Sequence, residues 1–299
     1  MSNKSVAGAV SGAKERAVQI VENADRLPSL PSIVLKLMDV VNSSNSSAED
    51  AARLIEKDPA LTGKMIRLAN SAFYGIPRSI SSVSSAVVIL GFNTIRSLVL
   101  SASVAKMFEG KHSLDMDRFW KHSIVTAMTA KIIVRHLMSV RMMDPESAFC
   151  AGILHDIGKL IFSQCMPEDY AGVCDYAKNN GISLVDAEET LLGINHAKMG
   201  KILADKWALP LDLEYALVHH HNPHAADQAS YLVNIIHLSD IIAHKLGCNL
   251  FDGEVCIEES GLCRAELKIG NADFDKIVQN VENSIDKSQE FLSAVIKSQ

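Results

Sequence analysis

The feature that most constrains the fold is an apolar run at residues 149–164, FCAGILHDIGKLIFSQ, which carries a His-Asp pair at its centre. Asp144-Pro145 just upstream is typical of a helix N-terminus, and the aliphatic spacing predicts one helix over 145–164 that faces a core. An unpaired buried charge is very costly, so His155 and Asp156 need polar partners. A metal ion would satisfy both. Taken alone, however, the pair favours a hydrogen-bonded core histidine beside a paired aspartate.

Length and charge narrow the classes of function. The 299 residues suffice for one large or two modest domains, and 48% hydrophobic content allows a substantial core. A net charge of −6 argues against a broad nucleic-acid footprint, so no nucleic-acid partner is expected. Neither a signal-like apolar segment nor a run of about 18 apolar residues occurs, so no membrane association is expected.

Cysteine usage indicates the compartment. The six cysteines are scattered and none forms a CxxC pair, which argues against a disulfide framework and against a structural zinc site. We expect reduced, mostly buried thiols and a cytoplasmic protein.

Helical patterns follow one another along the whole chain. No strand alternation, βαβ rhythm or internal repeat stands out, which predicts an all-α class. Residues 83–90 fit a helix or a strand by pattern alone, and Asn93 is expected to cap a helix that runs to about Phe108. Residues 248–270 are expected to be irregular, and 274–296 to form the closing helix.

Histidines and aspartates recur on separate predicted helices. The candidates are His122, His155-Asp156, His196, His219, His220, His221 and Asp240. Converging helices of a bundle are where carboxylate–histidine metal sites are built. Such donors suit one or two divalent ions of Fe, Mn, Zn, Ni or Co. Helix-end histidines can also simply cap carbonyls, which is the alternative for His196, His220 and His221.

The order His122, His155-Asp156, Asp240 resembles the H…HD…D signature of the HD superfamily of metal-dependent phosphohydrolases. The HDOD branch, related to HD-GYP proteins, is the most similar. LPSLPSIVLKLMDVV, DPALTGKMIRLANSAFYG and SSAVVILGFNTIRSLVL in the first half look like the N-terminal part of HDOD domains. The resemblance covers about residues 25–246.

The resemblance implies both a domain plan and a ligand set. The plan is an N-terminal helix (1–24), a helical N-terminal lobe (25–110), an HD-like metal-binding lobe packed against it (111–250) and a C-terminal segment with a helix (251–299). His122, His155, Asp156 and Asp240 match the four basic ligands, with Asp156 as the bridging carboxylate. His196, His220 and His221 match the extra histidines of dinuclear sites. Lys159 matches the lysine of HD-x-G-K, which could meet a phosphate oxygen, so Asp156 and Lys159 are the candidate catalytic residues.

Two departures limit the function. No GYP sequence follows His220-His221, and Arg118 stands where trinuclear sites have a glutamate, so at most two metals are expected. HDOD similarity implies a bacterial signalling regulator that binds a protein partner. An active phosphohydrolase on a nucleotide or another phosphorylated small molecule is the first alternative, and a metal-free scaffold is the second.

Overall fold

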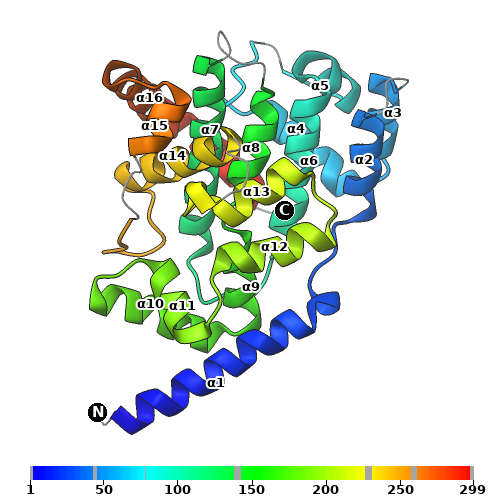
Figure 1. Ribbon diagram of the computed structural model, residues 1–299. Helices are drawn as coiled ribbons and strands as arrows, with labels where there is room; N and C mark the ends of the chain where they lie inside the picture. The colour runs from blue at the N-terminus through cyan, green and yellow to red at the C-terminus, as the bar shows by residue number, and fades with distance from the viewer. Residues whose placement is uncertain are drawn as a thin grey trace.

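The computed structural model describes residues 3–42, 46–77, 79–137, 143–225, 231–256 and 261–296, and the regular elements in this part of the chain are helices (Figure 1). The all-α prediction is confirmed. Among the described residues, β-structure is limited to one isolated parallel bridge between Ser183 and Val255. The helices are α1 (Asn3–Glu22), α2 (Ser32–Asn42), α3 (Ala48–Ile55), α4 (Pro59–Ala69), α5 (Val83–Leu90), α6 (Phe92–Met107), α7 (Met116–Leu137), α8 (Pro145–Leu154), α9 (Ile157–Cys165), α10 (Pro167–Asn180), α11 (Leu184–Leu192), α12 (His196–Lys206), α13 (Leu211–His219), α14 (Tyr231–Lys245), α15 (Gly261–Leu267) and α16 (Asn271–Ile296), with 3-10 turns η1 (Ala24–Arg26) and η2 (Pro223–Ala225).

Local capping explains where the N-terminal helices begin. Residues 83–90 form helix α5, because the Ser82 hydroxyl accepts a hydrogen bond from the Ser85 amide and caps the first turn. The prediction that Asn93 caps the next helix is wrong, since α6 already begins at Phe92. Gly91 precedes it with φ at 83°, a conformation that favours glycine.

The predicted single helix over 145–164 is in fact two helices. α8 ends at Leu154, Asp156 has φ −99° and ψ 10°, and α9 begins at Ile157. The His155 ring contributes to this break, because its Nδ1 donates to the Gly152 carbonyl at 2.7 Å. As a result, both side chains of the His-Asp pair face the same interior region.

Close helix packing surrounds this break. A methyl group on Gly152 would meet the Ala127 backbone nitrogen of α7 at 2.7 Å, and one on Gly158 would meet the Gly200 nitrogen of α12 at 2.9 Å. Both distances are shorter than side-chain carbons show in practice. The two glycines therefore let α7 and α12 approach the ends of α8 and α9.

The C-terminal region differs from the prediction in one element. Residues 248–270 were expected to be irregular, but α15 occupies 261–267 and packs against α14. The closing helix α16 starts at Asn271, three residues earlier than predicted, and packs on α7 and α4. It thus contacts both predicted lobes, 25–110 through α4 and 111–250 through α7.

A buried ion pair links α7 to α8, and aromatic residues from both predicted lobes surround it. Lys131 of α7 pairs with Glu146 of α8, and the Lys131 ammonium lies 5.3–5.7 Å from the ring centres of Phe73, Tyr74 and Phe149. One continuous hydrophobic core includes buried residues of both predicted lobes, 25–110 and 111–250. The domain boundaries at residues 24, 110 and 250 stay predictions.

The helices and the cysteines bear on two of the features expected from the sequence. None of the helices in the described ranges combines the length and the apolarity that a membrane crossing requires. All six cysteines lie in described ranges, and no disulfide joins any of them.

Candidate metal centre

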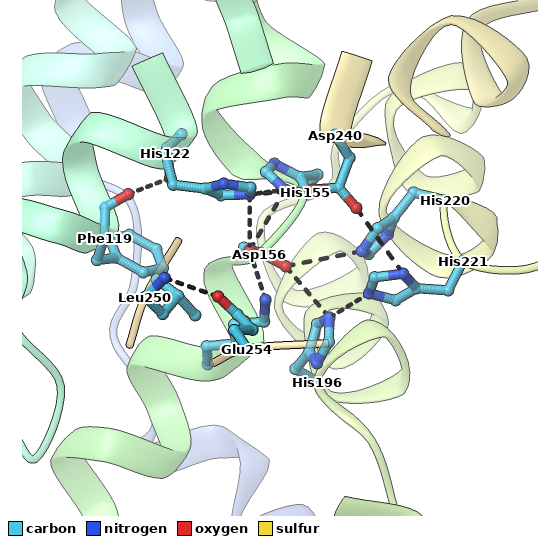
Figure 2. Close-up of polar contacts among 12 residues, drawn as sticks. Phe119, His122, His155, Asp156, His196, His220, His221, Asp240, Leu250 and Glu254 are labelled. Atoms are coloured by element: carbon cyan, nitrogen blue, oxygen red, sulfur yellow. Dashed lines mark hydrogen bonds and ion pairs between the residues drawn. The ribbon is translucent and has the colours of Figure 1, made fainter. Parts of the chain in front are cut away.

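All seven predicted ligands meet in one place (Figure 2). They come from α7, the α8–α9 junction, the first residue of α12, the end of α13 and the middle of α14. Six of the seven residues are buried, and the His221 side chain is 13% exposed. Their convergence therefore depends on five separate parts of the chain.

The first group is His122, His155 and Asp240, whose ligand atoms all lie within 4.8 Å of one another. The Nε2 atoms of His122 and His155 are 3.2 Å apart, and His122 Nε2 is 3.1 Å from Asp240 Oδ1. These atoms could hold one ion.

The second group is Asp156, His196, His220 and His221, which satisfies the same 4.8 Å limit. Asp156 Oδ1 lies 3.1 Å from His196 Nε2 and 3.7 Å from His220 Nε2. The Nε2 atoms of His196 and His221 are 2.8 Å apart. A second ion could be held here.

The Asp156 carboxylate lies between the two groups. Its Oδ1 faces the second group, while its Oδ2 lies 3.5 Å from His122 Nε2 and 3.3 Å from His155 Nε2. The Lys159 ammonium donates to Oδ2 at 2.7 Å. In an unbroken helix over 145–164, Lys159 would lie on the same face as His155, four residues before it. Because the helix breaks, it instead pairs with the aspartate.

Hydrogen bonds on the far side of each ring hold the imidazoles in position. The Nδ1 atoms of His122, His155 and His220 lie 2.7–2.8 Å from backbone carbonyl oxygens of Cys248, Gly152 and Leu217, respectively. A carbonyl only accepts, so each Nδ1 must carry the proton. The Nε2 atom of each ring is thereby directed at the centre, as in metal-ligating histidines generally.

Orphaned atoms test whether a metal fits. Buried atoms without a hydrogen-bond partner in the described structure include Asp156 Oδ1, Asp240 Oδ1, His220 Nε2 and His221 Nδ1. Buried polar groups are normally paired, so four such atoms at one place need an explanation. His122 and His155 also face each other through Nε2 atoms, which repel as two lone pairs unless a proton or a cation lies between them. The donor set therefore fits a divalent transition metal.

The electrostatics keep the carboxylates charged. Burial raises the pKa of Asp156, but the charges of His155 and Lys159 outweigh it and hold that pKa well below its ordinary value. For Asp240, burial is likewise outweighed by His244 and His122. Both groups are therefore anionic at neutral pH, which is the form that binds a metal.

The histidines divide into two kinds. Burial lowers the pKa of His220 to about 4 and that of His221 well below its ordinary value, so both rings are neutral. Burial also acts on His122 and His196, but Asp240 and Glu188 outweigh it and raise the pKa of these rings. A metal must therefore displace protons from His122 and His196.

Sequence reasoning missed several residues of the centre. Glu188 is fully buried and accepts from both the backbone N–H (2.8 Å) and Nδ1 (2.7 Å) of His196, while the Tyr170 hydroxyl donates to its other oxygen at 2.6 Å. These residues lie on α10, α11 and α12, and no sequence spacing predicts that they meet. His244, which is not among the predicted ligands, lies 3.4 Å from Asp240 Oδ1. Its i,i+4 spacing from Asp240 could have indicated this.

The centre is covered on its outer side. Arg118 does not take part in it and pairs with Asp252 at 2.9 Å. A cavity of about 20 Å³ adjoins the ligands, lined by residues that include Lys159, His196, His221, Asp240 and Glu254. This space is about the size needed for a single water.

The fold and the site define a class: a helical protein with a buried, paired His/Asp centre of the HD type. The HDOD domain model matches residues 27–223, about two thirds of the chain. The chain therefore belongs to the HDOD family, which is related to metal-dependent phosphohydrolases.

Known proteins agree with this assignment. A crystal structure of an HDOD domain protein of unknown function from Geobacter sulfurreducens superposes with a TM-score of 0.79 at 26% identity, covering 97% of this chain and 99% of that one. A candidate phosphohydrolase from Shewanella amazonensis gives 0.74 at 26% identity, covering 94% and 98%. An uncharacterised protein of Treponema pallidum is 24% identical over 81% of this chain. The chain spans only 46% of that relative's length.

Proposed function

We propose that this chain is a bacterial regulatory protein that holds one or two divalent transition-metal ions at the paired centre and acts by binding a signalling partner. The observation that supports this is a complete donor set with very little free space. The adjoining cavity is about 20 Å³, whereas pockets for small-molecule ligands are typically about 300–1,000 Å³. A centre of this kind accommodates ions and excludes a substrate.

Each residue has a defined part in this proposal. His122, His155 and Asp240 would hold one ion and His196, His220 and His221 the other, with Asp156 between them. A bound ion would supply Lewis acidity at this position. Lys159 stays protonated, because the negative charge of Asp156 more than offsets the effect of burial on its pKa, and it fixes the orientation of the shared carboxylate.

A phosphohydrolase acting on a nucleotide or another phosphate ester is the second candidate. The buried Lys159 ammonium beside the metal ligands favours it, since a fixed positive charge stabilises the charge that develops on a phosphoryl group. One structural relative bears the name of a candidate phosphohydrolase. Turnover in this chain would require the covered face to open.

Metal analysis tests the proposal. Purified protein, reconstituted with Mn, Fe, Zn, Co or Ni and desalted, is expected to retain one or two equivalents. Asp156→Asn should lose at least one of them, whereas Asp212→Asn, at an exposed position in the first turn of α13, should retain the wild-type content. If wild-type protein holds no stoichiometric metal, the proposal is wrong and a metal-free scaffold is the better description.

Two further assays separate the remaining alternatives. Release of p-nitrophenol from a generic phosphodiester, measured beside Asp156→Ala, tests the enzyme; equal rates in both proteins remove catalysis at this centre. A pull-down with the full chain, with and without metal, tests the signalling partner. Failure to retain any protein under both conditions argues against the regulatory role.

A further inference from the structure

Residues 249–256, here called the strap, lie beside the metal centre after α14. Its attachment is partly to the ligands themselves, because the carbonyl of the preceding residue, Cys248, accepts from His122 Nδ1. Leu250 is buried, Val255 bridges to Ser183, and Asp252 pairs with Arg118 of α7. The strap is therefore attached at three of its residues, and the residue before it is attached to a ligand.

The strap turns one acidic side chain inward. Gly253 has φ at 83°, and the Glu254 amide donates to the Phe251 carbonyl at 3.3 Å, which closes a tight turn. The Glu254 side chain is 3% exposed, whereas that of Asp252, two residues earlier, is 83% exposed. Figure 2 shows the Glu254 carboxylate on the Asp156 side of the centre, joined to Leu250 by a hydrogen bond.

The surroundings of Glu254 are those of an anion site. Its carboxylate lines the same cavity as Lys159, His196 and His221. It accepts from the Leu250 amide at 2.7 Å and lies 3.9 Å from His244 Nδ1. This position adjoins a fixed ammonium and the metal ligands, where an oxyanion would also be attracted.

We propose that Glu254 is an internal anion that occupies the place of an incoming phosphate group, so that the strap determines what the centre accepts. This inference rests on the proposed function, because it assumes that the centre holds metal. With the strap in place, a second anion meets both the negative charge of Glu254 and a cavity too small to contain it. Metal ions enter and phosphate is excluded.

The strap is also displaceable. The Arg118–Asp252 pair is solvent-exposed on both sides, at 42% and 83%, and exposed ion pairs contribute little to stability. Val255 is 40% exposed. Release of this segment would carry Glu254 out of the centre and leave Lys159 facing solvent.

Phosphate binding to the metal-loaded full chain tests the inference. Inorganic phosphate is titrated calorimetrically into wild type, Glu254→Gln and the control Glu168→Gln, an exposed position on α10. Wild type and control are expected to bind with Kd above about 1 mM. Glu254→Gln keeps the side-chain shape but loses the charge that attracts the strap to Lys159, so the strap should be displaced more readily. This variant should therefore bind phosphate about ten- to a hundredfold more tightly. Metal content is measured in the same samples.

The possible results lead to different conclusions. Equal phosphate affinity in all three metal-loaded proteins, or wild-type binding below about 0.1 mM, overturns the role of Glu254 and leaves the proposed function intact. Loss of metal from Glu254→Gln alone overturns it too, because Glu254 would then be a ligand. Absence of metal from every protein overturns both the proposed function and this inference.

A second variant guards against misfolding. Asp252→Asn removes the exposed ion pair with Arg118 and leaves the buried residues unchanged. It is expected to tighten phosphate binding by up to about fivefold, in proportion to the small energy of such a pair. No gain in this variant counts against a displaceable strap.

Discussion

Gly158 is the residue at which packing and the metal centre are most directly connected. It is the glycine of the HD-x-G-K sequence, and a methyl group there would overlap the His196 backbone carbonyl and lie 2.9 Å from the Gly200 nitrogen. All of these neighbours are backbone atoms of α12, so no side chain can move aside. Gly158→Ala must therefore separate α9 from α12.

The magnitude follows from this geometry. Restoring ordinary contact distances requires a separation on the order of 1 Å. Overpacking of this kind lowers the free energy of unfolding by about 1–3 kcal/mol. Metal–ligand distances tolerate only about 0.2 Å, so the shift should also move His196 away from Asp156 and empty the second ligand group. Gly158→Ala is therefore expected to be only moderately destabilised but to lose the metal of the second ligand group.

Gly172→Ala is the matched control. Gly172 lies on α10 with no atom within 4 Å of the added methyl group, so this variant should keep full metal content and gain up to about 1 kcal/mol from helix propensity. Urea unfolding and metal analysis after reconstitution measure both quantities. A Gly158→Ala protein with wild-type stability and wild-type metal content would refute the packing argument.

Three further predictions concern the surroundings of the centre. Glu188→Gln should weaken metal binding by about 10–100-fold in a competition titration, because Glu188 orients His196, and an unchanged affinity would contradict this. Metal affinity should rise with pH, because protons compete with the metal for His122 and His196, whose pKa values are raised above the ordinary 6.5. The affinity should level off above these pKa values, and a flat profile from about pH 5 to 8 would argue against these ligands. Lys131→Met should lower the free energy of unfolding in urea by about 3–5 kcal/mol, because it leaves the Glu146 carboxylate buried and unpaired, and adding Glu146→Gln should recover part of it. Equal stability of the single and double variants would show that the pair matters little.

Local signals in the sequence were sufficient for the class of fold. Ser47 with Asp50 forms a capping box, Asp144 and Asn195 cap their helices, and apolar residues recur at helical spacing. These interactions span a few residues, so they can be read along the chain. They also placed the cap of α6 two residues too late, at Asn93, because the helix starts where Gly91 adopts a positive φ and not at a capping side chain.

The candidate ligands could be named from the sequence, but not their arrangement. Residue type, order and the HDOD resemblance selected the seven ligands, and all of them meet at the centre. Their roles as metal ligands stay predictions. The break between α8 and α9 was not predicted. It arises where His155 Nδ1 donates a hydrogen bond to the Gly152 carbonyl and where the side chains of His155 and Asp156 both face the interior.

The sequence by itself determined an all-helical chain and the chemistry available to its interior, because helix periodicity, caps and residue type are local properties. Only the tertiary structure decided that Asp156 lies between two ligand groups and that Glu188 accepts hydrogen bonds from His196. It also decided that Glu254, in the turn after α14, lines the cavity beside the centre. Those relations depend on how five segments pack against one another. Backbone contacts such as that of Gly158 with α12 set this packing, and no spacing along the chain encodes it.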